Sequence, residues 1–551
     1  MCHRIVNMRF IKFFTPCRSL RDFLCVLAFG CLLPSIGYTQ VSLDWTARYS
    51  GPSNAIDQAH AIAVDASGNT YVTGGADRNE PALGGDIVTA KYDADGNQVW
   101  TARYENPGAL ADAPTAITLD GTGHVYVTGY SHGHSSIITA QDYVTLKYSP
   151  NGVQLWAARY SAPTNSPSGA RSVDYPRAIA VDSSGSVYVT GSTSDSAGQS
   201  RDYATVKYDS NGNQLWAAIY DGSDHSSDSA TCLAVNGQGE VYVGGYSALV
   251  KYDPEGNQLW IQLTPVSDVA LDLQGNVVTA GPSLLESSDD GEQSDFQIAK
   301  YRPDGERLWR TLYDGGIGES DSATYVRLDR VGNIYVSGNS ASRCDWVTDD
   351  GHLEKVCDTV ISTLKLAPDG QQLWAARYAS ADQTMHFPVG LELDTAGNVY
   401  VVGSEGPWSR TVTLKYASNG TRLWGIAYRV PNHGWDSPAG IAISATGGVY
   451  VAGSSHWNDG ASSDYFVLKY TQTVEPPFHL HSPWKSAQEF GFEVDSASVL
   501  PFVIETSVNL QDWSVVATNS SPTSGNPVTF PIGTDARPRF FRVRSMVGTA
   551  E

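Results

Sequence analysis

The sequence is poor in positive charge. Its 551 residues contain 36 lysines and arginines against 58 aspartates and glutamates, which gives a formal net charge of −22. A surface this acidic repels phosphate backbones and anionic lipids, so we expect neither nucleic acid nor a membrane surface as a partner. No segment after residue 39 is apolar for long enough to insert into a membrane, and the apolar residues show no helical period.

Cysteine is also scarce: there are seven, and four of them lie in the first 39 residues. This leading segment is basic and is followed by an apolar stretch, Phe23–Ile36, that is too short to span a bilayer. We therefore expect residues 1–39 to be a signal peptide and the protein to be exported. An exported location permits a disulfide between Cys344 and Cys357, the alternative being two unpaired thiols.

What the sequence has instead is a strand-rich unit repeated eight times from about Val41 to Tyr470. A unit of about 45–65 residues with four short strands is typical of a propeller blade. One marker, a Tyr-Val-x-Gly strand, starts at Tyr71, Tyr126, Tyr188, Tyr242, Tyr335, Tyr400 and Tyr450, with Val278–Gly281 as a degenerate copy. The other, a Leu-Trp-Ala-Ala-Arg-Tyr-like strand, has its tryptophan at Trp45, Trp100, Trp156, Trp216, Trp260, Trp309, Trp374 and Trp424.

These two markers are out of phase. Trp45 precedes the first complete unit, and no tryptophan strand follows the last unit, which ends at Tyr470. A propeller has two open sheet edges unless its first and last blades are joined. We therefore predict an all-β protein in which residues 40–470 form an eight-bladed β-propeller, with the N-terminal strand Leu43–Tyr49 completing the eighth blade and closing the ring.

Aspartates recur at two places in the unit. At a strand entrance, an aspartate usually accepts hydrogen bonds from the backbone N–H groups of the adjoining turn, so we interpret both series as architecture. The series before the first strand is Asp57, Asp112, Asp174, Asp228, Asp321 and Asp436; the series before the third is Asp86, Asp142, Asp202, Asp295, Asp358 and Asp464.

The repeated segments Gly-Asn-x-Tyr-Val-x-Gly, Asp-x-x-x-Lys-Tyr and Gly-x-x-Leu-Trp resemble the SBBP repeat family. The resemblance implies an exported bacterial β-propeller without assigned chemistry, located in the periplasm, at the cell surface or outside the cell. The family name implies seven blades, whereas this chain has eight copies. The tryptophan strands also resemble those of quinone-dependent dehydrogenases, but the neighbouring cysteine pair of those enzymes is missing.

Prolines at 476, 477 and 483 predict a linker over residues 471–483 and a small C-terminal β-domain, a β-sandwich, over residues 484–551. The tail contains Ser507-x-x-Leu-x-x-Trp513 and later Phe540-Phe541-Arg542. In these segments it resembles the small C-terminal β-modules of secreted proteins from Verrucomicrobia-like bacteria. That resemblance implies a role in attachment or sorting.

The long loops of the repeats indicate where a ligand would bind. Connections from the first to the second strand and from the third to the fourth are tight turns on one face. The other connections are variable and open on the opposite face, and variable loops on a rigid scaffold commonly carry binding sites. These long loops include residues 131–141, 161–175, 282–294, 339–357 and 454–463.

Four tryptophans lie in the long loops of the sixth to eighth units: Trp346, Trp408, Trp435 and Trp457. His433 and His456 accompany them. Because adjacent blades would place these aromatic rings in one sector, we predict that they form a shared surface for carbohydrate or protein. The alternative is that each tryptophan packs against its own blade.

Catalytic and metal-binding motifs are weak in this sequence. Gly129-Tyr-Ser-His-Gly133 matches the nucleophile elbow of hydrolases in letters, but it ends a repeat strand and no helix follows. An acidic loop offers a calcium site as a hypothesis, with a solvated loop as the alternative; its carboxylates are Asp289, Asp290, Glu292 and Asp295. No other cofactor or metal is predicted.

Taken together, these patterns predict a monomeric, non-catalytic, exported propeller that binds carbohydrate or protein through its long-loop face. One alternative is a hydrolase or lyase acting on polysaccharide, with carboxylates and histidines near the central channel, such as His60, His386 or His433. Another is a purely structural cell-surface protein held by its tail.

Overall fold

In the computed structural model, residues 41–472 form one compact unit and residues 473–551 belong to a second. The described residues are strands and turns, which confirms the predicted all-β class. They contain no helix long and apolar enough to cross a membrane. The structure describes residues 39–545 except 52–54, 79–84, 107–110, 133–140, 164–171, 195–200, 223–226, 284–285, 289–290, 317–318, 350–351, 381–384, 407–409, 432, 458–461, 475–478, 486–488, 496–501, 508–513, 520–526 and 532–539.

The 41–472 unit consists of antiparallel four-stranded repeats, each a simple meander. The first four are β2 (Ile56–Val64), β3 (Thr70–Arg78), β4 (Asp86–Tyr92) and β5 (Gln98–Tyr104); β6 (Asp112–Leu119), β7 (Val125–His132), β8 (Gln141–Tyr148) and β9 (Gln154–Tyr160); β10 (Val173–Val181), β11 (Val187–Ser194), β12 (Arg201–Tyr208) and β13 (Gln214–Tyr220); and β14 (Ala230–Val235), β15 (Val241–Gly245), β16 (Leu249–Tyr252) and β17 (Gln258–Gln262).

The meanders continue in the same way along the second half of the unit. Repeat 5 is β18 (Asp268–Leu271), β19 (Val277–Pro282), β22 (Phe296–Tyr301) and β23 (Arg307–Tyr313), with a small hairpin of β20 (Glu286–Ser288) and β21 (Gly291–Gln293); repeat 6 is β24 (Ser322–Leu328), β25 (Ile334–Asp349), β26 (His352–Leu366) and β27 (Gln372–Tyr378); repeat 7 is β28 (His386–Leu393), β29 (Val399–Glu405), β30 (Arg410–Tyr416) and β31 (Arg422–Tyr428).

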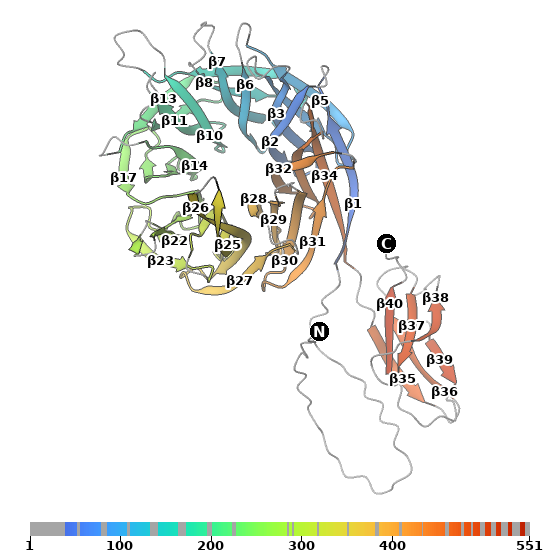
Figure 1. Ribbon diagram of the computed structural model, residues 1–551. Helices are drawn as coiled ribbons and strands as arrows, with labels where there is room; N and C mark the ends of the chain where they lie inside the picture. Colours follow the sequence, from blue (N-terminus) through green and yellow to red (C-terminus); the bar gives the residue numbers. More distant parts are fainter. Residues whose placement is uncertain are drawn as a thin grey trace. The chain divides into compact units, whose positions relative to one another are not determined.

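Repeat 8 combines the two ends of the unit. Its strands β32 (Trp435–Ile443), β33 (Val449–His456) and β34 (Ser463–Val474) are followed in the sheet by β1 (Thr39–Tyr49), which pairs with β34. A parallel pairing of Ile56 with Ser463 also links repeats 1 and 8. In Figure 1 the sheets of this unit follow one another around a centre, with β17 and β27 at the rim.

The hydrophobic core is divided into clusters that lie between successive repeats, because each sheet presents apolar side chains to both neighbours. Between repeats 2 and 3, for example, Tyr143 packs with Val189 and Val206. The cluster between repeats 8 and 1 is of the same kind: Ala47 of β1 and Val467 of β34 pack with Val72 of β3. The first and last repeats of the sequence therefore share a core in the way that sequence neighbours do.

A second contact recurs at the junctions between repeats. The indole Nε1 of Trp156 and the Nζ of Lys147 both donate to the backbone oxygen of Ser210, in a turn of the next repeat, at 3.1 and 3.2 Å. Trp45 of β1 and Lys469 of β34 converge in the same way on the oxygen of Ala94 in repeat 1, at 3.0 and 2.8 Å. The chain ends of the unit thus reproduce the contacts of an internal junction.

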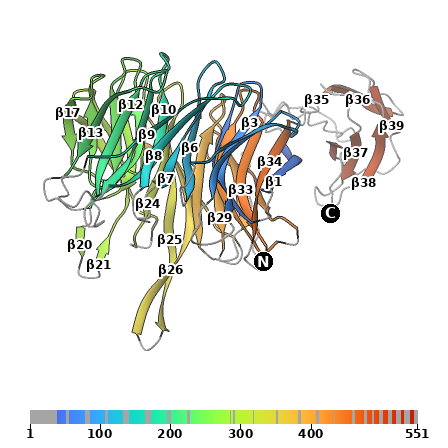
Figure 2. The ribbon, with the colours of Figure 1, turned by 90° about the horizontal axis from the view of Figure 1, so that it is seen from above.

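One predicted loop is a hairpin instead. The segment 339–357 is not an irregular loop, because β25 continues to Asp349 and β26 begins at His352, and together they form a long hairpin that projects beyond the other strands (Figure 2). The strands also enter the predicted linker 471–483, since β34 continues to Val474 and the next strand begins at His479. In the 339–357 segment and in the predicted linker, the strands continue further than the turn-forming residues in the sequence suggest.

The C-terminal unit is built from two three-stranded antiparallel sheets. Its six described strands fall in the order β35-β36-β39 in one sheet and β38-β37-β40 in the other. Their bounds are β35 (His479–Lys485), β36 (Glu489–Asp495), β37 (Phe502–Ser507), β38 (Ser514–Asn519), β39 (Pro527–Pro531) and β40 (Phe540–Ser545).

Candidate functional site

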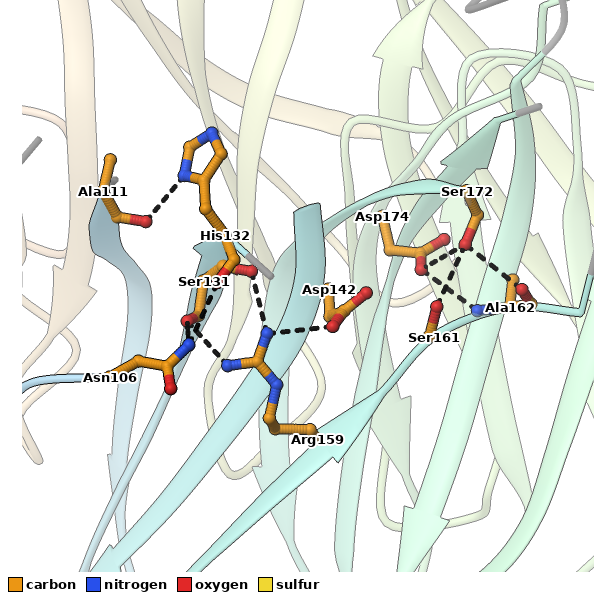
Figure 3. Close-up of polar contacts among 10 residues, drawn as sticks. All are labelled: Asn106, Ala111, Ser131, His132, Asp142, Arg159, Ser161, Ala162, Ser172 and Asp174. Atoms are coloured by element: carbon orange, nitrogen blue, oxygen red, sulfur yellow. Dashed lines mark hydrogen bonds and ion pairs between the residues drawn. The ribbon is translucent and has the colours of Figure 1, made fainter. Parts of the chain in front are cut away.

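The aspartates before the first strands act as predicted, as acceptors for backbone N–H groups. Asp174 accepts from the backbone of Ala162 at 3.0 Å and from the hydroxyl of Ser172 at 2.8 Å (Figure 3). Burial raises the pKa of Asp174 to about 6. Equivalent bonds from a residue six positions earlier reach Asp57, Asp112, Asp228, Asp321 and Asp436.

Two of the aspartates before the third strands, Asp86 and Asp142, have a different role from the predicted one. Asp142 accepts from the guanidinium of Arg159 at 2.9 Å, and this guanidinium also donates to the hydroxyl of Ser131 at 2.8 Å (Figure 3). Asp86 is paired with Arg103 in the same manner. The arginine of the Leu-Trp-Ala-Ala-Arg-Tyr strand is therefore a partner of this carboxylate, and both groups belong to the scaffold.

His386, one of the histidines considered for catalysis, occupies the place of the first aspartate in repeat 7. It is fully buried, and its Nε2 accepts from the backbone N–H of Ser380, again six positions earlier, at 3.1 Å. Its Nδ1 lies 2.9 Å from the backbone oxygen of Thr359. These bonds explain His386 as a structural substitute for aspartate. His60 lies on β2 with its Nδ1 2.9 Å from the oxygen of Gln58.

Four of the predicted site residues lie together at the start of β32 and the end of β33. Trp435 and His456 are cross-strand partners, and their rings are stacked with centroids 3.4 Å apart and an interplanar angle of 11°. The rings of His433 and Trp457 are 4.1 Å apart. We call these four residues the aromatic cluster.

Within the aromatic cluster the two histidines are buried and the two tryptophans are half-buried. His433 and His456 are 5% and 6% exposed, whereas Trp435 and Trp457 are 37% and 38% exposed. The histidines thus support the indole rings from beneath, while part of each indole faces solvent. Flat, rigid, partly exposed rings of this kind supply binding area at a low cost in side-chain entropy.

Burial keeps both imidazoles neutral near pH 7. It lowers the pKa of His456 to about 4. The pKa of His433 is also lowered, first by burial and then by the charge of Arg48, although the carboxylates of Asp464 and Asp436 oppose the shift. The aromatic cluster therefore carries no positive charge of its own at neutral pH.

This pKa shift predicts a pH dependence of stability. Between pH 6.5 and pH 4 the unfolded chain protonates His456 but the folded chain does not, so the stability that depends on its neutral form is complete above about pH 6.5 and is lost as the pH falls toward 4. In His456→Gln we expect this loss in the free energy of unfolding, up to about 3 kcal/mol, to be absent. Free energies of unfolding in urea, measured at pH 7.5 and 4.5 for both proteins, test this. Equal pH slopes in the two proteins would contradict it.

The other two predicted tryptophans are not part of the aromatic cluster as the structure describes it. Trp346 is 64% exposed and lies on the long β25–β26 hairpin of repeat 6, where its strand partner is Lys355. The same hairpin contains a disulfide between Cys344 and Cys357. Trp408 lies outside the described residues.

Sequence reasoning missed two arginines that border the aromatic cluster. The Nη2 of Arg48, on β1, is 3.0 Å from Nε2 of His433 and 3.9 Å from a carboxylate oxygen of Asp464. Arg429 donates to the backbone oxygens of His433, at 3.4 Å, and of Gly434. Arg48 is the repeated arginine of its strand, so its position beside Asp464 follows once β1 is assigned to repeat 8.

Among the described residues, three carboxylates lie close enough to hold a cation: oxygens of Asp295, Asp314 and Asp321 are all within 4.8 Å of one another. Both oxygens of Asp321 already accept backbone N–H groups, from Gly315 and Ala341. Of the predicted calcium loop, Asp295 belongs to this group and Glu292 lies on β21, whereas Asp289 and Asp290 lie outside the described residues.

Comparison with known families supports the repeat assignment. Residues 156–196, from the last strand of repeat 2 into repeat 3, match the SBBP family, described as a beta-propeller repeat. No curated protein matches the sequence.

Several solved structures are similar over large parts of the chain. A protein of unknown function from Bacteroides caccae is 13% identical, with a TM-score of 0.30, over 56% of this chain and 93% of that one. The polysaccharide lyase Uly1 is 11% identical, with a TM-score of 0.41, over 74% and 89%. PorZ, a surface component of the type-IX secretion system of Porphyromonas gingivalis, is 10% identical, with a TM-score of 0.31, over 88% and 69%. Similarities this low assign no activity to the chain.

Proposed function

We propose that the chain is an exported, eight-bladed β-propeller, closed by β1, that binds carbohydrate without catalysis through its long-loop face. The aromatic cluster carries this proposal, because it presents two half-exposed indole rings, each packed against a buried histidine. Ligand-binding on the surface of a rigid scaffold needs such pre-organised groups. A protein ligand is the second candidate, since exposed tryptophan is also enriched in protein interfaces.

The closed eight-bladed ring is supported by two independent features of the junction between repeats 8 and 1. The apolar cluster there has members from β1, β34 and repeat 1. The convergence of Trp45 and Lys469 on Ala94 matches the internal junctions. Closure also places Arg48 next to His433, so the proposed site depends on it.

Carbohydrate is favoured over an apolar ligand by the composition of the site. The rings of Trp435 and Trp457 provide flat apolar area, while the guanidiniums of Arg48 and Arg429 provide donors at the border. A pyranose ring has an apolar face and a rim of hydroxyl groups, so it needs both kinds of contact.

Replacing both tryptophans by alanine should weaken the binding strongly. Each ring should contribute about 1–2 kcal/mol, so Trp435→Ala with Trp457→Ala is expected to weaken binding by about 100-fold. The measurement is affinity electrophoresis or calorimetry of the full chain against a panel of neutral and acidic polysaccharides.

Trp346→Ala is the matched control, because Trp346 is more exposed but lies on a different repeat. It should bind the same polysaccharides as the wild type. Equal loss in the control and the double variant, or no loss in either, would contradict the assignment of the site. Sugar release from any polysaccharide of the panel would contradict the non-catalytic part of the proposal, and binding only to proteins would favour the second candidate.

Export and a monomeric state complete the proposal. Both rest on the sequence: a basic, apolar leading segment within residues 1–39 and an acidic surface. Cell fractionation and sedimentation of the secreted product are the measurements that decide them. The similarity of the C-terminal unit to attachment modules stays a prediction, for which loss of surface retention after removal of residues 473–551 is the test.

A further inference from the structure

The border of the aromatic cluster carries an unusual balance of charge for so acidic a protein. Two guanidiniums lie there: that of Arg48, near the end of β1, and that of Arg429, directly after β31. Both residues are exposed, and the side chain of Arg48 is 39% accessible. The whole chain has a formal charge of −22, whereas two exposed arginines lie beside the two indoles here.

Among the described residues, the two carboxylates that act on His433 are buried. Asp436 is fully buried and accepts the backbone N–H of Val430 at 2.7 Å. Asp464 is 8% exposed and its oxygen is 3.9 Å from Arg48, at the far limit of an ion pair. Of these described groups, the two guanidiniums are therefore exposed and the two carboxylates are buried.

The arginines also keep hydrogen-bonding capacity for a ligand. A guanidinium has five N–H donors in a fixed planar arrangement. The described contacts of Arg48 and Arg429 in this cluster use the Nη2 group of each. The remaining donors match the paired oxygens of a carboxylate or a sulfate, which guanidinium binds through parallel hydrogen bonds.

We propose that the aromatic cluster recognises an acidic glycan, in which a sugar ring stacks on Trp435 or Trp457 and its carboxylate or sulfate is bound by Arg429 and Arg48. This inference rests on the proposed function, because it assigns a ligand class to the same site. The indoles select a sugar ring, and the arginines select the charged ring over a neutral one. Repulsion by the acidic remainder of the surface limits such ligands to this cluster.

The test compares each acidic polysaccharide with its own neutral form. Full-length protein is titrated with polygalacturonate and with the same polymer after carboxyl reduction, and with a sulfated galactan before and after desulfation. The acidic form should bind at least about tenfold more tightly, and added salt should remove most of that difference. The two polymer pairs distinguish a carboxylate from a sulfate as the preferred group.

Arg429→Gln should reduce the preference for the acidic form about fivefold, because glutamine keeps a neutral hydrogen-bond donor but loses the positive charge that pairs with a carboxylate or a sulfate. Arg343→Gln is the matched control, because Arg343 is also exposed but lies on the β25–β26 hairpin. It should keep the wild-type preference. Poly-glutamate, which has the charge without the sugar ring, should not compete.

The outcomes separate this inference from the proposed function. Equal binding of the acidic and neutral forms, lost in the double tryptophan variant, would overturn the acidic specificity and leave carbohydrate binding intact. An acidic preference that is unchanged in Arg429→Gln would overturn the role of the arginines. Competition by poly-glutamate would show that charge alone is recognised and would overturn the glycan assignment. Absence of binding to every polymer would overturn both proposals.

Discussion

Deletion of residues 39–50 is expected to unfold the 41–472 unit or to reduce its melting temperature by well over 10 °C. The deletion removes β1, and with it the indole of Trp45 that donates to Ala94 and the partner strand of β34. Loss of a packed tryptophan alone costs about 3 kcal/mol, and the total stability of a protein is typically about 5–15 kcal/mol. Circular dichroism and tryptophan fluorescence during heating would measure the effect.

The deletion should also change the solution behaviour of the protein. It leaves the backbone edge of β34 without its partner, and an open edge of this kind promotes association between chains. Size-exclusion chromatography should show larger species, and a synthetic peptide of residues 39–50 should restore the monomer. Leu43→Ser is the matched control on the same strand: because Leu43 is 42% exposed, melting should hardly change. A deletion variant that melts like the wild type would contradict the closed ring.

The periodic part of the fold could be predicted from the sequence because each strand carries its own signal. Tyr-Val-x-Gly and Leu-Trp strands alternate with glycine turns, and the offset between the two series indicates that β1 belongs with β34. The hairpin of β25 and β26 could not be predicted in this way. Its residues, Ser342–Cys357, lack the repeat's markers, and their pairing depends on continuation of the ladder beyond Ala341.

The aromatic cluster was only partly predictable. Tryptophans outside the repeat positions could be counted, and Trp435 and His456 could be aligned by the register of the strands they flank. The grouping of Trp346 with them could not be decided, since loop position does not fix the direction of a hairpin. Arg429 carries no sequence signal, because only the folded backbone brings its guanidinium to the oxygen of Gly434.

His386 shows why residue type alone misleads in a repeat protein. A buried histidine in a propeller invites a catalytic interpretation, but His386 accepts from a backbone N–H six positions earlier, as Asp112 and Asp228 do in their repeats. Both kinds of side chain offer an acceptor to the equivalent backbone N–H. The position of His386 in the repeat therefore predicts its role better than the chemistry of the imidazole does.

Gly212→Ala is expected to destabilise the 41–472 unit strongly, because this glycine meets two requirements at once. Its φ is +86°, a conformation that a residue with a Cβ adopts only with strain, and an added Cβ would lie 2.7 Å from Cδ2 of Trp156 in the preceding repeat. The same indole donates to Ser210, so it cannot move away without losing that bond. Six other junctions have a glycine against a tryptophan in the same way: Gly96, Gly152, Gly256, Gly305, Gly370 and Gly420.

Gly447→Ala separates the two contributions. Gly447 has a φ of +84°, but no atom lies within 4 Å of the position its Cβ would take. Its substitution should therefore cost only the backbone strain, about 1 kcal/mol, whereas Gly212→Ala should cost about 2 kcal/mol more through overpacking against the indole. Free energies of unfolding from urea titrations would measure both. If the two variants were equally stable, the close approach of the indole would contribute nothing at this junction. The equivalent contact of Trp45 with Gly96 would then give no support to the proposed closure between repeats 8 and 1.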